Sequence, residues 1–208
     1  MPRRTIAIAA ALSVLALGSP LITGCTNPLA TQYFNQGVEK YEAGNYQGAI
    51  DDWSKAIEIN PQNAAAYYNR GDAKDNLGDD QGAIADYTKV IEINPQNVIA
   101  YYNRGVSKGN LKDHQGAISD YDKAIELDPQ NADAYNNRGV SKSYLEDYQG
   151  AISDYTKVIE INPQYASAYY NRGIARELVN DLAGACSDWR KAADFGLKEP
   201  AQWVKNQC

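Results

Sequence analysis

The fold is decided by the stretch AAAYYNRGDAKDNLGDDQGAIADYTKVIEINPQN, residues 64–97. Apolar residues recur at helical spacing on both sides of a turn at Gly78, which predicts one helix over 64–77 and a second over 80–93. Pro95 ends the second helix, because proline lacks an amide hydrogen and restricts the residue before it. The stretch therefore reads as a helix-turn-helix unit.

The same unit recurs along the chain with a period of 34 residues. Its aromatic residues are Tyr33, Tyr67, Tyr101, Tyr135 and Tyr169, its glycines are Gly37, Gly71, Gly105, Gly139 and Gly173, and its prolines are Pro61, Pro95, Pro129 and Pro163. This period, with two helical patterns per unit, resembles the tetratricopeptide repeat. The resemblance implies an all-α, right-handed α-solenoid of five repeats, over 30–63, 64–97, 98–131, 132–165 and 166–199.

The chain ends in a predicted cap. Residues 200–208 are expected to form a short helix that covers the apolar face of the last repeat, as solenoids require. Cys186 lies early in the last second helix, and Cys208 ends the cap. In an oxidising compartment these two form an even pair, which makes a disulfide one prediction. Two separate thiols, one buried and one at a frayed end, are the alternative.

The composition is that of a globular chain without a recognisable catalytic centre. Twenty basic and 26 acidic side chains give a net charge of −6, which argues against a broad nucleic-acid-binding surface. One histidine, one methionine and three cysteines leave little for a metal or redox centre. No phosphate loop, dinucleotide fingerprint or serine elbow is present. We expect His114 to be solvated, and predict no enzyme, no cofactor and no metal site.

The N-terminus has the pattern of an export signal. Arg3 and Arg4 precede an apolar run over 6–17 that is too short to span a bilayer comfortably. The segment Leu21-Ile22-Thr23-Gly24-Cys25 then resembles the bacterial lipoprotein box. The alternative is an uncleaved N-terminal anchor with an incidental cysteine.

The lipoprotein resemblance implies that the protein is located at a membrane. Residues 1–24 would be removed as a signal peptide, Cys25 would carry the lipid, and residues 25–29 would form a tether. Several acyl chains on one cysteine hold a protein firmly at a membrane. Thr26 in place of aspartate favours the outer membrane, facing the periplasm. The Asn-Arg-Gly repeats are also similar to those of cyanobacterial-type lipoproteins of this repeat family.

Charged residues recur at positions that point from the first helix toward the second. Four repeats place an arginine before the glycine, five place a base four residues further on, and the second helices carry facing acids. The arginines are Arg70, Arg104, Arg138 and Arg172, the bases are Lys40, Lys74, Lys108, Lys142 and Arg176, and the acids are Asp52, Asp86, Asp120, Asp154 and Asp188. We predict a structural ladder of Arg–Asp pairs, which fixes register more than it adds stability.

The opposite face of the first helices is the expected working surface. Its candidate binding residues are Phe34, Asn35, Tyr68, Asn69, Asp72, Tyr102, Asn103, Val106, Asn137, Val140, Tyr170 and Asn171. The face contains acids but no lysine or arginine, so we expect a neutral or basic peptide segment as partner. The carboxylate clamp of some family members uses groove lysines or arginines and is not expected here.

One asparagine per repeat, from Asn35 to Asn171, lies at the margin of this face. A row of amides can pair with the N–H and C=O groups of an extended peptide without reading its side chains. This resembles the asparagine ladder of some members of the family. Equally, the asparagines can bond to the backbone of the neighbouring repeat and hold the stack together. Both interpretations remain open at this point.

These features predict a non-enzymatic, membrane-anchored scaffold that binds an extended peptide or partner protein in its concave groove. Envelope, pilus, outer-membrane or photosynthetic complex assembly are the processes in which we expect such a lipoprotein. The alternative is a structural, self-associating solenoid whose groove is filled by its own copy. A stable dimer with an occluded groove would favour that alternative.

Overall fold

The computed structural model of the protein describes residues 27–197 and Cys208. Within residues 27–197 the chain forms ten α-helices and no strand. The helices are α1 (Pro28–Glu42), α2 (Tyr46–Ile59), α3 (Ala64–Asn76), α4 (Asp80–Ile93), α5 (Val98–Asn110), α6 (His114–Leu127), α7 (Ala132–Tyr144), α8 (Tyr148–Ile161), α9 (Ala166–Leu178) and α10 (Leu182–Asp194). The predicted all-α solenoid of helix-turn-helix repeats is confirmed.

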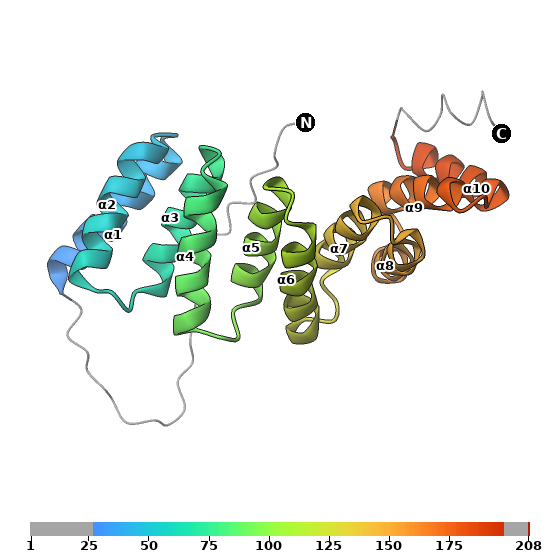
Figure 1. The fold of residues 1–208 in the computed structure, drawn as a ribbon. Coiled ribbons are helices and arrows are strands. Elements are labelled where there is room, and N and C mark those ends of the chain that lie inside the picture. The colour runs from blue at the N-terminus through green and yellow to red at the C-terminus, as the bar shows by residue number, and fades with distance from the viewer. Residues whose placement is uncertain (1–26, 198–207) are drawn as a thin grey trace, which may run out of the picture.

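Each repeat is an antiparallel pair, and the pairs stack in chain order into an elongated row (Figure 1). Every helix packs most closely against its neighbours in sequence. The first helices of successive repeats also meet directly, α5 against α7 and α7 against α9. This brings the first helices together on one side of the row and places the candidate groove there.

The core of each repeat depends on a large ring opposite a glycine. Tyr87 and Tyr121 are buried on the second helices, beside fully buried alanines. A Cβ added at Gly71 would lie 3.1 Å from Tyr87 Cε1, and one added at Gly105 would lie 2.7 Å from Tyr121 Cε1. The glycines therefore recur because the ring of the second helix occupies the space that a side chain would need.

The turn between the helices of a repeat passes through the left-handed region. Gly44 and Gly78 have φ angles of +76° and +82° at this position in the first two repeats. The later repeats carry Lys112, Glu146 and Asn180 there, with φ angles of 65°, 62° and 64°. The fold thus keeps one turn geometry where the sequence no longer supplies glycine.

The tether prediction was wrong at its C-terminal end. Helix α1 begins at Pro28, two residues before the predicted repeat boundary. Asn27 caps it, because its side-chain oxygen accepts a hydrogen bond from Leu29 N at 3.0 Å. Proline fits the first turn of a helix, since its missing amide hydrogen is not needed there.

The predicted signal peptide, Cys25 and the helical cap over residues 200–207 lie outside the described residues. None of the helices in the described part of the chain is long and apolar enough to cross a membrane.

Candidate functional site

The side of the first helices that faces the second helices is closed by ion pairs. Arg70 binds the Asp86 carboxylate with two arms, Nε to Oδ2 at 2.9 Å and Nη2 to Oδ1 at 2.6 Å. Lys74 Nζ adds a third contact at 2.8 Å. Asp86 is only 2% exposed, so these contacts replace the water that would surround its carboxylate at the surface. The predicted ladder of Arg–Asp pairs is confirmed.

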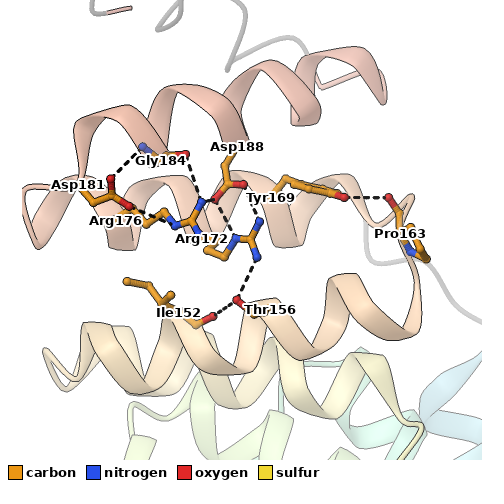
Figure 2. Close-up of polar contacts among 9 residues, drawn as sticks. All are labelled: Ile152, Thr156, Pro163, Tyr169, Arg172, Arg176, Asp181, Gly184 and Asp188. Atoms are coloured by element: carbon orange, nitrogen blue, oxygen red, sulfur yellow. Dashed lines mark hydrogen bonds and ion pairs between the residues drawn. The ribbon is translucent and has the colours of Figure 1, made fainter.

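The arginine ladder also links successive repeats. In the last repeat, Figure 2 shows Arg172 on α9 contacting Asp188 of its own repeat and Thr156 of the preceding one. The Nη1 atoms of Arg70 and Arg104 make the same backward contact to Ser54 and Thr88, each at 3.0 Å. The ladder therefore fixes repeat register and leaves the opposite face to other side chains.

Tyrosines and asparagines on the groove side bond across the repeat boundary. Asn103 Nδ2 donates to Tyr68 Oη at 3.2 Å, and Asn137 Nδ2 donates to Tyr102 Oη at 3.0 Å. Burial raises the pKa of the Tyr102 phenol to about 12, so Tyr102 is protonated at neutral pH. Asn103 and Asn137 thus bond to tyrosine side chains of the preceding repeat and help to hold the stack together.

The partner of each of these asparagines depends on the residue 35 positions before it in the sequence. Asn171 Nδ2 meets Asn136 Oδ1 at 3.5 Å, because residue 136 is an asparagine where repeats 2 and 3 carry tyrosine. The corresponding partner of Asn69 would be Phe34, which has no hydroxyl group. A side-chain amide has two N–H groups and one carbonyl oxygen. The bond across the repeat boundary uses one of these groups, so the amide can still form further hydrogen bonds.

Acidic side chains gather on the repeat-2 part of the groove. The Tyr41 hydroxyl group of α1 donates a hydrogen bond to the Asp72 carboxylate. Burial raises the pKa of Asp72, and this hydrogen bond lowers it in part. Next along, Asp80 accepts a hydrogen bond from Asn110 Nδ2 at 2.7 Å, and Ser107 Oγ lies 3.4 Å from Asp75 Oδ1. The repeat-2 part of the groove therefore suits a positively charged ligand.

A hollow of about 240 Å³ opens where α5, α6 and α7 meet. It is lined by Val106, Gly109, Asn110, His114, Tyr121, Asn137, Val140, Ser141 and Tyr144. Three predicted groove residues, Val106, Asn137 and Val140, thus come together at one place. The other predicted residues are spread along the first helices and do not converge on a single site.

The prediction that His114 is solvated was wrong. Its ring stacks on Tyr144 with ring centres 4.4 Å apart and an interplanar angle of 6°. The His114 Nδ1 atom is buried and has no hydrogen-bond partner in the described structure. The sequence signal for this role was its place in the repeat, where Tyr46 and Tyr148 stand in other repeats.

The C-terminal residue is held against the last repeat. Cys186 of α10 and Cys208 are joined by a disulfide, with Cα atoms 5.7 Å apart. Arg190 Nη2 also reaches the Cys208 carbonyl oxygen at 3.5 Å. Among the described residues, no three histidine, cysteine, aspartate or glutamate side chains are grouped in a way that could hold a metal ion.

Comparisons with known proteins agree with this architecture. Models of the tetratricopeptide repeat (TPR) match residues 37–78, 64–97, 98–131 and 132–165. The sequence has no significant match among curated proteins.

Among solved structures, MamA is 28% identical, with a TM-score of 0.77 over 80% of this chain and 91% of that one. YrrB, described as a TPR protein with an unusual peptide-binding site, is 22% identical, with a TM-score of 0.75 over 85% and 92%. PilF of Pseudomonas aeruginosa is 18% identical, with a TM-score of 0.70 over 82% and 78%. The family models span more than half of the sequence, and the chain belongs to the tetratricopeptide repeat family.

Proposed function

We propose that the protein is a non-enzymatic scaffold that binds an extended segment of another protein along the groove formed by its first helices. The observation that carries this proposal is the row of partly buried tyrosines and asparagines on that face, typified by Tyr68, Tyr102 and Asn103. Tyrosine supplies contact area at a low cost in conformational entropy. The peptide-binding site in the description of YrrB, whose fold is shared, is consistent with this role.

The amide ladder supports an extended conformation of the bound segment. Asn103 and Asn137 recur one repeat apart, and each uses one N–H group on a tyrosine of the preceding repeat. The Asn137 carbonyl oxygen also accepts a hydrogen bond from Asn136 Nδ2 at 3.2 Å, which leaves it one lone pair. Their remaining hydrogen-bonding groups suit the N–H and C=O groups of a peptide backbone. The acids Asp72 and Asp80 favour a neutral or basic segment over an acidic one.

We also propose that the protein is anchored to a membrane. The lipoprotein box ending at Cys25 supports lipidation there after export, with the solenoid held at the outer membrane and facing the periplasm. A scaffold in this place would serve the assembly of an envelope, pilus, outer-membrane or photosynthetic complex. Cys25→Ala tests this step: the variant is expected to leave the membrane fraction and to lack acyl groups by mass spectrometry. Membrane retention of the variant would contradict lipid anchoring.

Crosslinking and mass spectrometry of the full chain in its membrane test the groove. The variant with Tyr68, Tyr102 and Asn103 changed to alanine should lose its captured partners while its helicity persists. As a control, Lys89→Ala with Glu92→Ala removes an exposed ion pair, 2.6 Å long, from the second helix α4. This control should keep all partners. Retention of every partner by the groove variant would place the binding surface elsewhere.

A further inference from the structure

One register position on the groove side of the first helices differs between repeats. It is occupied by Tyr41, Asp75, Gly109, Ser143 and Glu177. Only the third repeat has no side chain there, although glycine is the weakest helix former after proline. A Cβ added at Gly109 would find only Tyr121 Oη, 4.0 Å away. Gly109 therefore leaves open space where other repeats place a side chain.

The first repeat shows which kind of group fits this space. The Tyr41 ring packs against Tyr46, with ring centres 5.2 Å apart, and against Trp53, at 5.9 Å. Its hydroxyl group contacts Asp72 and accepts a hydrogen bond from Asn76 Nδ2 at 3.0 Å, both on the next repeat. An aromatic ring thus fills this position between repeats 1 and 2.

The hollow between repeats 3 and 4 has related walls and no side chain at residue 109. His114 and Tyr121 stand where Tyr46 and Trp53 enclose Tyr41, and Val140 stands where Asp72 meets its hydroxyl. The walls differ at Tyr144, which stands where Asn76 bonds to Tyr41 and stacks its ring on His114 as one aromatic wall of the hollow. An apolar cavity of about 150 Å³ holds benzene. The hollow measures about 240 Å³, so it has room for an aromatic side chain.

We propose that this hollow receives an aromatic side chain from a basic segment bound in the groove. The inference rests on the proposed function and deepens it. We choose phenylalanine over tyrosine, because the position where Asp72 accepts the hydrogen bond of Tyr41 is held here by apolar Val140. The charge preference comes from one adjacent acid: Asp80 accepts a hydrogen bond at 2.7 Å from Asn110, which lines the hollow.

The probe is a short capped peptide of glycine and serine with one central phenylalanine between two lysines. The comparison peptides replace phenylalanine by tyrosine or alanine, or the lysines by glutamates. We expect the phenylalanine peptide to shift the methyl resonances of Val106 and Val140, and alanine to weaken binding by about tenfold or more. Tyrosine and glutamate should each weaken it as well. Equal binding of the phenylalanine and alanine peptides would overturn the proposal.

Filling the hollow provides the matched variant. Gly109→Leu places a side chain into open space and should abolish the preference for phenylalanine while helicity persists. Gly109→Ser is the control, because the next repeat carries Ser143 at this register, and it should keep the preference. A preference unchanged in Gly109→Leu would show that the ring binds elsewhere.

Failure of this inference differs from failure of the proposed function. If Gly109→Leu captures the same partners as the parent through its first helices, the groove binds protein but the hollow is not the anchor. If phenylalanine binds the hollow but no partner crosslinks to the first helices, the proposed function is wrong. A dimer that dissociates in Gly109→Leu would assign the ring to a second copy and overturn the basic-segment proposal.

Discussion

Arg104 forms a bidentate ion pair with the buried carboxylate of Asp120, with Nε 2.9 Å from Oδ2 and Nη2 2.6 Å from Oδ1. Its third nitrogen reaches Thr88 of the preceding repeat, and Lys108 contacts the same carboxylate at 2.8 Å. The pair thus joins the two helices of a repeat and the repeat before it. Its role is to fix register, and the groove lies on the opposite face.

Arg104→Met is therefore expected to destabilise the solenoid without abolishing partner binding. Removing one partner of a buried ion pair typically costs about 3–5 kcal/mol. Lys108 still neutralises Asp120, so we expect a loss of about 2–3 kcal/mol in the free energy of unfolding. Urea denaturation followed by helicity measures it. Lost binding with an unchanged midpoint would contradict the structural assignment.

Glu146→Gly is expected to stabilise the protein. Glu146 is exposed and has a φ of 62°, which an L residue adopts at a cost of about 1–2 kcal/mol. Glycine removes this cost but loses more chain entropy on folding, so the net gain should be about 0.5–1 kcal/mol. Thermal unfolding measures the change.

Two controls bracket the effect of Glu146→Gly. Gly78→Ala, at the equivalent turn, should destabilise, because the Gly78 φ is +82°. Asn180→Gly should change little, since asparagine tolerates this region better than glutamate. A loss of stability in Glu146→Gly would show that the Glu146 side chain makes a contribution larger than the backbone strain.

The repeat and its polar ladder could be predicted from the sequence because they depend on local periodicity. Gly71 and Tyr87 lie at fixed spacing within one repeat, and so do Arg70 and Asp86. The helical period sets the face on which each residue lies, and the short turn within a repeat brings the two helix faces together. The partner of Asn103 could not be predicted in the same way. Tyr68 lies in another repeat, and its distance depends on the offset between stacked helix pairs.

The hollow could not be predicted from the sequence for a different reason. It is a space left by a missing side chain at Gly109, and its size depends on how Tyr121 and Val140 pack around it. His114 was misjudged because a lone histidine carries no pattern of its own. Comparing equivalent positions across the repeats supplies the signal, since the chain contains both the filled and the open form of the same site.

Loss of the Cys186–Cys208 disulfide is expected to destabilise the last repeat. The bond closes a sequence separation of 22 residues, and the entropy of a loop of this length corresponds to about 3 kcal/mol. Cys208→Ser should lower the melting temperature, and a reductant should lower that of the parent but not of the variant. Two reactive thiols in the denatured, unreduced protein, with Cys25 blocked, would exclude the bond.

Asp72 should make the free energy of unfolding of the protein depend on pH. Burial raises its pKa above the ordinary value of 3.8, against the hydrogen bond from Tyr41. The folded state then holds this proton more tightly than the unfolded chain does. Its contribution to stability is present below the unfolded pKa and is lost as the pH rises through the folded pKa.

Asp72→Asn removes this titration. The variant's free energy of unfolding should therefore gain on that of the parent as the pH rises from about 4 toward neutrality. Tyr41→Phe should steepen the decline of the parent, because the ionised carboxylate loses its donor. Urea denaturation at a series of pH values measures both effects. A difference between Asp72→Asn and the parent that stays constant across this range would show that Asp72 ionises as freely in the groove as in the unfolded chain.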